Sequence, residues 1–304
     1  MGYKPQPWQL VLLIALICGV SLGGVVWYHS RAVTPAAMLK RMPAENTWVL
    51  WIDFIALRRA GILDLLAGAK ASEDPEYQAF VRRTRFDYMQ DLDTAMAAFA
   101  PTGNFFLVKG RFDWKSLRSY VESMDGNCLN SLCRVSGSGP DRRISFLPLR
   151  PDVMALAASP DDYAVVGLTH ARSGPDPVVP DAPVWLATPG SVLKSALFPD
   201  TFRLFTRSME NAVSVTLAFV PQSDRLAARL DVRCRNERDA RQAASELASA
   251  IQLVRNLREQ QLEAPGPADP AKVLAAGTIR GEGQHVYGDW PIERAFVQSL
   301  LGTQ

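Results

Sequence analysis

The sequence predicts an α+β protein: an N-terminal transmembrane helix followed by two α+β lobes with mixed or antiparallel sheets. Three observations lead to this prediction. The composition is that of a globular chain, with 48% hydrophobic and 21% charged residues among 304. One long uncharged apolar segment stands near the start. Behind it, strand-like and helix-like segments follow one another, and their order recurs after a proline-rich stretch.

The charge balance and the cysteine content exclude several classes of protein. The formal net charge is only +2, whereas nucleic-acid-binding proteins usually concentrate basic residues on one face. Four cysteines are too few for a disulfide-dense scaffold. We therefore expect a tethered soluble domain, with a substantial core and no nucleic-acid partner.

The apolar segment Leu10–Tyr28 contains no charged residue and has the length of about 20 residues that a helix needs to cross a bilayer. Trp8 precedes this segment and Trp27 and Tyr28 close it, at positions that interfacial aromatic residues prefer. We interpret it as a transmembrane anchor in contact with membrane lipid. The predicted N-terminal segments are a short cytoplasmic tail (1–9), the transmembrane helix (10–28) and a spacer (29–45).

Two other interpretations of this segment fit less well. A cleaved secretory signal has an apolar region of about 7–15 residues and a small-residue cleavage site, but Val26 and Trp27 stand where the cut would fall. A lipoprotein signal needs a small residue before its cysteine, but Ile17 precedes Cys18. Basic residues near the membrane slightly favour a cytoplasmic body. Long domains are nevertheless exported largely regardless of charge, so we expect the body to lie outside the bacterial inner membrane.

Gly19 and Gly23 give the predicted span a small-xxx-small spacing, which lets two helix backbones approach closely. Such pairs are common by chance. The spacing nevertheless offers a route to self-association, and another envelope protein is the alternative partner.

The first lobe is predicted over residues 46–172. NTWVLWIDF is almost continuously apolar and rich in β-forming residues, as in a strand that is covered on both faces. Leu92, Met96 and Phe99 recur at helical spacing. The expected elements are a strand (46–54), a short helix, an amphipathic helix (75–84), a helix over 92–99, a strand (104–110), a helix after Asp113 and a hairpin turning near Pro151.

A proline-rich linker, SGPDPVVPDAP (173–183), separates this lobe from a second one at 184–304. PVWLA predicts a short strand and SVLKSALF a helix. Alternating apolar residues predict strands over 213–220 and 229–235, and Asn236 begins a long helix with one apolar stripe. A further hairpin and a closing helix follow. The recurring order leaves open whether the lobes are two diverged copies of one unit.

Cys128 and Cys133 bracket CLNSLC, a polar loop just after a helix. Outside the cytoplasm this pair could close a small disulfide loop, and two free thiols are the alternative. Zinc is not expected, because a zinc site needs four ligands, usually at short spacings. Cys234 lies on the apolar face of a predicted strand and is better explained as a small core residue.

No catalytic, cofactor-binding or metal-ligating set emerges from the sequence. His29, His170 and His285 are far apart, and no G-x-S-x-G nominates a nucleophile. Neither a phosphate-binding loop nor a calcium loop is present. We therefore name no catalytic residue and no cofactor.

Three stretches, EDPEYQAFVRRTRFDYMQDLD, FFLVKGRFDWKSLRSYV and RRISFLPLR, resemble uncharacterised bacterial proteins with one N-terminal membrane span. The resemblance covers about residues 40–165. It implies an envelope-facing α+β region and brings no activity or catalytic residue with it.

These observations favour a single-pass, membrane-anchored, extracytoplasmic protein that acts as a binding or scaffolding module. One alternative is an envelope enzyme, hydrolase-like, whose site is assembled between the lobes with His170 or His285 near a carboxylate. Another is an accessory subunit of a membrane complex.

Overall fold

The structure is a computed structural model that describes residues 33–63, 75–137, 142–194, 203–222, 225–260 and 269–300. The predicted membrane span lies outside these ranges, as do Trp8, Trp27, Gly19 and Gly23. Among the helices that are described, none combines the length and the apolarity needed to cross a bilayer.

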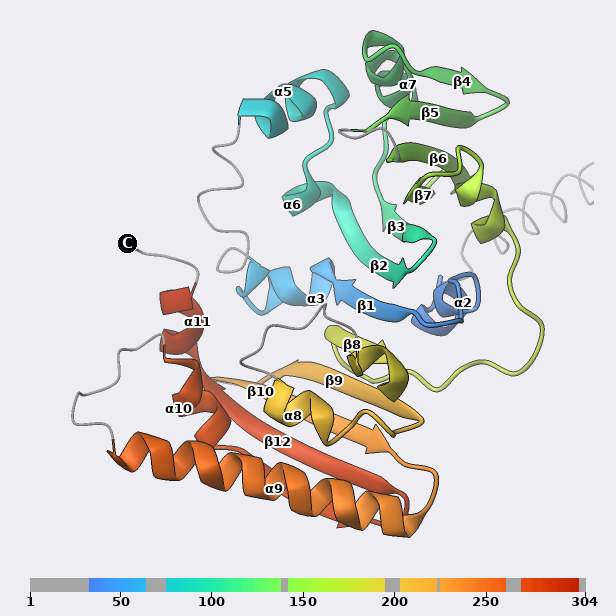
Figure 1. Cartoon of the computed structure of the whole chain (residues 1–304). Coiled ribbons are helices and arrows are strands. Elements are labelled where there is room, and N and C mark those ends of the chain that lie inside the picture. Colours follow the sequence, from blue (N-terminus) through green and yellow to red (C-terminus); the bar gives the residue numbers. More distant parts are fainter. Residues whose placement is uncertain are drawn as a thin grey trace, which may run out of the picture.

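The strands form one 12-stranded sheet in which all neighbours pair antiparallel (Figure 1). Its order is β11-β12-β10-β9-β8-β1-β2-β3-β7-β6-β5-β4. The strands are β1 (Trp48–Asp53), β2 (Leu92–Ala100), β3 (Gly103–Gly110), β4 (Asn127–Leu129), β5 (Leu132–Ser136), β6 (Arg143–Arg150), β7 (Val153–Ser159), β8 (Val184–Thr188), β9 (Ser214–Pro221), β10 (Arg225–Arg233), β11 (Thr278–Glu282) and β12 (His285–Glu293).

Helices accompany both halves of the sheet. They are α2 (Pro35–Leu39), α3 (Phe54–Arg59), α5 (Pro75–Thr84), α6 (Tyr88–Asp91), α7 (Trp114–Ser123), α8 (Arg203–Arg207), α9 (Glu237–Gln260), α10 (Pro270–Ala275) and α11 (Arg294–Leu300), with the 3-10 helices η1 (Ala164–Thr169) and η2 (Gly190–Lys194). The prediction of an α+β fold is thus confirmed. The two predicted lobes share one sheet, however, instead of each forming a sheet of its own.

The central strands β1 and β8 join the two halves of the sheet. Trp51 lies directly opposite Trp185, and their rings stack with centroids 6.4 Å apart. The strand order outward from this pair is β1-β2-β3-β7-β6 on one side and β8-β9-β10-β12-β11 on the other. Residues 173–183 run between the halves as an irregular connection.

Side chains that alternate along the first-half strands supply two separate packed layers. Trp51, Met96 and Leu107 point to one face. There they are covered by Met38 of α2, by Met42 just after it and by Leu168 of η1. Ile52, Ala95 and Val108 point to the other face and pack against Phe54 and Leu57 of α3. Both faces of the central strands are therefore apolar, as the composition of NTWVLWIDF predicts.

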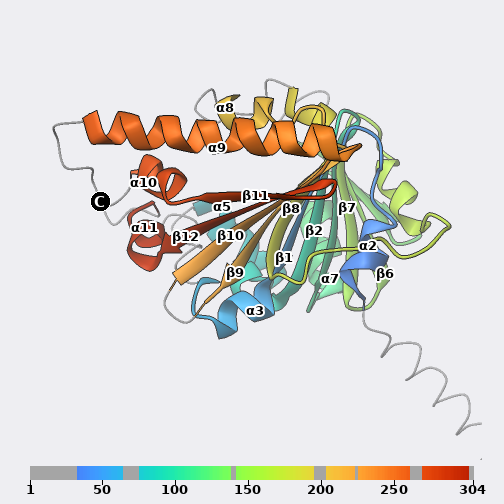
Figure 2. The same cartoon turned by 90° about the horizontal axis from the view of Figure 1, so that it is seen from below.

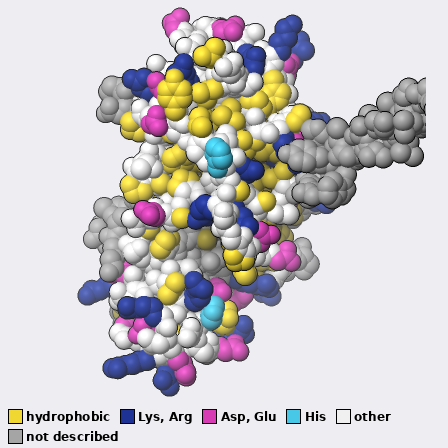
Figure 3. Space-filling view, turned by 90° about the vertical axis from the view of Figure 1, so that its right-hand side faces the viewer, with side chains coloured by type: hydrophobic (Ala, Val, Ile, Leu, Met, Phe, Trp, Pro, Cys, Tyr) yellow, Lys and Arg dark blue, Asp and Glu magenta, His cyan; other side chains and the backbone are white. Residues whose placement is uncertain are grey.

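The long helix α9 covers one face of the second half of the sheet (Figure 2). Its buried Ala243 and Leu247 pack with Val232 of β10 and Val286 of β12. The opposite face of β10 and β12 carries charged side chains, such as Arg229, Asp231 and Asp289. In Figure 3, charged side chains are frequent at the lower end of the molecule, and hydrophobic ones gather in its upper half. Among the described residues, β10 and β12 are thus covered on the α9 face, whereas β8 and β9 are also packed on their other face, through Trp185 and Ala218.

The prediction of a helix over 92–99 is wrong, because this segment forms the strand β2. Met96 and Ala98 are fully buried on one face. On the other face Phe99 lies opposite Trp48 and stacks on it, with ring centroids 4.1 Å apart. Packing against two neighbouring strands outweighs the helix propensity of this alanine-rich segment, which is a weak local preference.

Candidate functional site

A pocket lies where α7 approaches strands β5 and β6, at the end of the sheet opposite α9. Its cavity volume is about 310 Å³, which is at the lower end of the range for small-molecule sites. Aromatic, proline and cysteine side chains make up most of its wall, and two basic side chains reach it from α7. The lining residues are Trp114, Lys115, Arg118, Ser131, Cys133, Phe146 and Pro148.

The helix α7 is fixed at both its start and its buried side. The Asp113 carboxylate accepts hydrogen bonds from the backbone N–H groups of Lys115 and Ser116, each at 3.1 Å. The backbone N–H of Ser116, followed by its side-chain hydroxyl, holds the pKa of Asp113 below its ordinary value. Leu117 and Val121 are buried on the sheet side. The first turn of α7 therefore holds its side chains at the pocket in a defined orientation.

The floor of the pocket is aromatic. The Trp114 indole N–H donates to the backbone oxygen of Pro151 at 2.9 Å, and its ring lies 5.3 Å from that of Phe112. Phe146 is buried and packs in one cluster with Cys133 and Val121. Because the indole nitrogen of Trp114 already has an acceptor, what the tryptophan offers to the pocket is its apolar ring surface.

The opposite wall is a tight hairpin, β4–β5, that is closed by a disulfide between Cys128 and Cys133. The two cysteines lie directly opposite each other in the ladder. Asn130 and Ser131 form the turn with φ values of 47° and 71°, the left-handed conformations that a two-residue hairpin requires. The segment that the sequence predicts as a polar loop is thus an ordered edge of the sheet.

The two basic side chains at the rim have no acidic partner among the described residues. Arg118 donates to the Ser131 hydroxyl at 3.3 Å, and Lys115 is exposed. Other basic side chains of this half do pair with carboxylates. The pairs are Arg111 with Asp91 at 2.9 Å, Arg143 with Asp162 at 2.8 Å and Arg150 with Asp152 at 3.0 Å. Positive charge therefore remains available at the mouth of the pocket.

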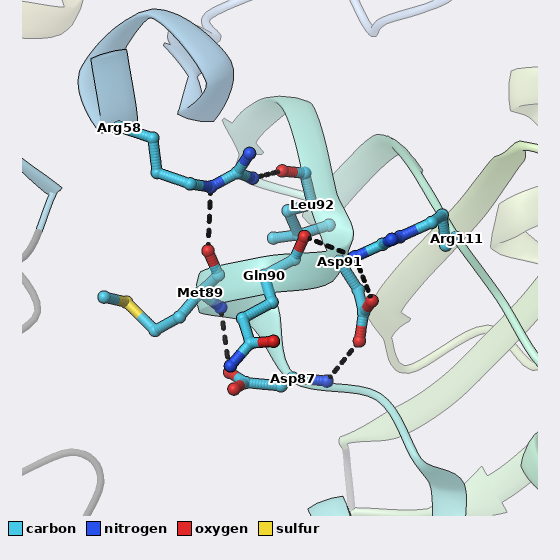
Figure 4. A network of polar contacts seen from close by, with 7 residues as sticks. All are labelled: Arg58, Asp87, Met89, Gln90, Asp91, Leu92 and Arg111. Atoms are coloured by element: carbon cyan, nitrogen blue, oxygen red, sulfur yellow. Dashed lines mark hydrogen bonds and ion pairs between the residues drawn. The ribbon is translucent and has the colours of Figure 1, made fainter. Parts of the chain in front are cut away.

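A polar network holds the segment that leads into β2 next to the strand that leads into α7 (Figure 4). Arg58 of α3 donates to the backbone oxygens of Met89, at 2.8 Å, and of Leu92. Arg111, just after β3, donates to the backbone oxygen of Gln90 at 2.9 Å and pairs with Asp91. These bonds connect the approach to α7 with the central part of the sheet.

A second polar cluster lies on the open face of β10, β11 and β12. His285 Nδ1 is 2.7 Å from the Asp231 carboxylate. The His285 ring stacks on Tyr287 with centroids 5.7 Å apart, and the Arg280 guanidinium lies over Tyr287. His285 thus lies near a carboxylate, as the enzyme alternative predicts, but both residues belong to the second half of the sheet and not to a site between the two lobes. Both side chains are partly exposed on a sheet face.

The remaining residues considered in the sequence lie apart from both clusters. His170 contacts the hydroxyl of its neighbour Thr169 at 2.9 Å. Cys234 is a free, buried cysteine, and desolvation raises the pKa of its thiol, as expected for a core residue. In the described part of the chain, no three His, Cys, Asp or Glu side chains are grouped so that they could hold a metal ion.

Most of the pocket residues were not predicted from the sequence. Trp114 and Lys115 were assigned only to a helix, and Phe146 and Pro148 only to a strand. The available signal was the WKSLR segment of α7, which places an aromatic and two basic residues on neighbouring positions of one helical turn. Nothing local indicated that Ser131 and Phe146 would meet them.

No protein-family model matches the sequence, and no curated protein sequence matches it. Solved structures do share the fold. The structure of crystal form IV of TP0453 aligns with a TM-score of 0.51 and 10% identity, covering 87% of this chain and 94% of that one. Crystal form I of TP0453 aligns with a TM-score of 0.49 and 10% identity, over 89% and 97% of the two chains. At this identity the likeness to crystal form IV shows a common fold.

Proposed function

We propose that this protein is a single-pass, membrane-anchored binding or scaffolding module whose body lies outside the cytoplasm, and that the pocket beside α7 is its binding site. The observation that carries the proposal is that one wall of this pocket is a disulfide-closed hairpin. Disulfides persist in oxidising compartments and are rare in the cytosol. A ligand-sized cavity beside such a bond supports a binding role in the cell envelope.

The chemistry of the pocket supports binding more than catalysis. Its wall is apolar apart from Lys115, Arg118 and Ser131, and the Ser131 hydroxyl accepts a hydrogen bond from Arg118. A nucleophile needs an adjacent base, and general acid–base chemistry needs titratable groups that converge on the reacting atoms. The described pocket residues include neither arrangement.

The membrane part of the proposal comes from the sequence. The uncharged segment 10–28, with Trp8 before it and Trp27 and Tyr28 at its end, would anchor the body to the bacterial inner membrane on its periplasmic side. Through this span, Gly19 and Gly23 could also bring two copies together, with another envelope protein as the alternative partner.

We further propose that the two halves are copies of one α+β unit. The matching strand orders on either side of β1 and β8 support this. The positions of Trp51 and Trp185 support the same relation, because each lies on the innermost strand of its half and directly opposite the other. In such a pair of copies, α7 of the first half corresponds to α9 of the second. The pocket and its disulfide hairpin would then be additions that are specific to the first copy.

Cysteine labelling in cells tests the location. Val178 is fully exposed in the connection between the halves, so Val178→Cys offers an accessible thiol in a background that lacks Cys18 and Cys234. We expect a membrane-impermeant maleimide to label Val178→Cys once the outer membrane is permeabilised. A matched Gly2→Cys variant in the tail should be labelled only after lysis. Labelling of Val178→Cys only after lysis would place the body in the cytoplasm and refute the proposal.

The His285–Asp231 pair favours a second candidate function, an envelope hydrolase. A carboxylate that accepts from Nδ1 of a histidine orients the imidazole as hydrolases require. Turnover of short-chain nitrophenyl esters by the purified protein that disappears in His285→Ala, and persists in His170→Ala, would favour this function. Equal background rates in all three proteins would remove it.

A further inference from the structure

We propose that the pocket beside α7 takes a small organic anion with a flat apolar body, such as an aromatic carboxylate. This inference rests on the proposed binding function and specifies its ligand class. Two features of the pocket carry it: the apolar surfaces inside and the unpaired positive charges at the mouth.

The inner surfaces fit a flat ring better than a polar ligand. The rings of Trp114, Phe146 and Pro148 line the cavity, and Cys133 of the disulfide-closed hairpin lies beside them. Aromatic rings pack against each other in stacked or edge-to-face arrangements that add to the gain from burial alone. At about 310 Å³, the cavity holds the volume of roughly ten liquid water molecules, enough for one or two fused rings.

The rim supplies the complement to a negative charge. Lys115 and Arg118 stand three residues apart on α7, so their side chains project from neighbouring positions of the same helix face. Neither has a carboxylate partner among the described residues. The Ser131 hydroxyl, held by Arg118 at 3.3 Å, adds a polar group beside them. A carboxylate bound at the mouth would meet a guanidinium that can donate two hydrogen bonds and an ammonium that adds a point charge.

Two acidic side chains lie near these charges, and among the described residues neither forms an ion pair with Lys115 or Arg118. Glu122 lies one helical turn after Arg118 on α7. The Asp113 carboxylate precedes the first turn and is engaged by the Ser116 hydroxyl at 2.8 Å and by two backbone N–H groups. It thus serves as the cap of α7, and the anion-binding positions on Lys115 and Arg118 stay open.

Calorimetric titration with four probes tests the ligand class on the full chain in detergent. The probes are 2-naphthoate, its neutral analogue 2-naphthylmethanol, acetate and decanoate. We expect 2-naphthoate to bind more tightly than the neutral analogue by about tenfold at low salt, and this preference to shrink as salt is added, because the charges are exposed. Acetate, which lacks the ring, should not bind measurably.

Two double variants identify the site. Lys115→Gln with Arg118→Gln should bring the affinity for 2-naphthoate down to that for the neutral analogue, a loss of about tenfold from two exposed charge contacts. The control, Arg233→Gln with Arg238→Gln, removes two exposed positive charges from the second half and should leave both affinities unchanged. A pocket variant, Trp114→Leu, should weaken both ring-containing probes alike.

The possible failures are distinguishable. Equal binding of 2-naphthoate and 2-naphthylmethanol, unaffected by the Lys115 and Arg118 variant, would overturn the anionic ligand class but leave a binding pocket. Binding of decanoate more tightly than 2-naphthoate would overturn the flat-ring part of the inference. Absence of binding by every ring-containing probe, with no chemical-shift change of the Trp114 indole N–H, would overturn the inference and count against the pocket as the binding site.

Discussion

Reduction of the Cys128–Cys133 disulfide is expected to lower the stability of the protein by about 2 kcal/mol. The bond closes a short loop, since its cysteines are separated by 5 positions. For a loop of this size, the loss of chain entropy in the unfolded state corresponds to about 2 kcal/mol at 25 °C. Reduction leaves both sulfur atoms in place. The buried contacts of Cys133 therefore remain, and the measurement isolates the cross-link itself.

The assay is guanidinium unfolding followed by tryptophan fluorescence, with and without a phosphine reductant. A Cys234→Ala background removes the buried free thiol, so that no other cysteine of the described residues can exchange. A loss of about 2 kcal/mol corresponds to a fall in melting temperature of about 4–8 °C for a domain of this size. Peptide-level hydrogen exchange should locate the increased opening in β4 and β5.

Two results would refute this reasoning. A change below about 0.5 kcal/mol would mean that the hairpin is as constrained without the bond as with it, against the entropic account. A loss above about 4 kcal/mol would mean that the bond holds packing beyond its own loop. The reduced protein should also bind 2-naphthoate more weakly, because Cys133 and Ser131 form part of the pocket wall.

Three further predictions concern the helix cap, the polar network and the core. Hydrogen bonds lower the pKa of Asp113 in the folded chain. The contribution of this carboxylate to stability is therefore present above the ordinary carboxyl pKa and is lost as the pH falls through the pKa of the folded state. The difference in unfolding midpoint between wild type and Asp113→Asn should shrink between pH 6 and pH 2. Arg58→Met leaves two backbone oxygens without their donor and should cost about 1–3 kcal/mol in denaturant unfolding, whereas the exposed Arg59→Gln should be neutral. Met96→Ala, at a fully buried position, should lower the free energy of unfolding by about 2–5 kcal/mol. Leu253→Ala, at an exposed position, is the control, and equal stability of the two variants would contradict the assignment of β2 to the core.

The sequence predicts those elements whose local pattern is unambiguous. The alternation in VSVTLAFV and RLDVRCR identifies β9 and β10, and Asp113 and Asn236 stand at the starts of α7 and α9, where each side chain caps a backbone N–H. Strand β2 was missed because Leu92, Met96 and Phe99 satisfy a helical spacing as well as a strand that is covered on both faces.

The candidate site depends on contacts that no local pattern encodes. The pocket forms only because β6, which follows the hairpin in the chain, brings Phe146 opposite Cys133. The hairpin itself reads as a polar loop in the sequence, since CLNSLC contains few residues that favour strands. The cross-strand position of its two cysteines becomes evident only when Asn130 and Ser131 adopt their left-handed turn.

The pairing of β1 with β8 at the centre of the sheet has a consequence for how the chain is made. β1 leaves the ribosome before β8, and β8 follows only after the rest of the first half has been synthesised. Until then, one edge of an apolar strand is open, and such an edge invites pairing with other chains. Contacts of this sequence separation also slow folding. We therefore expect the body to complete its sheet late, after β8 has been synthesised, and to be most prone to misassembly during that interval.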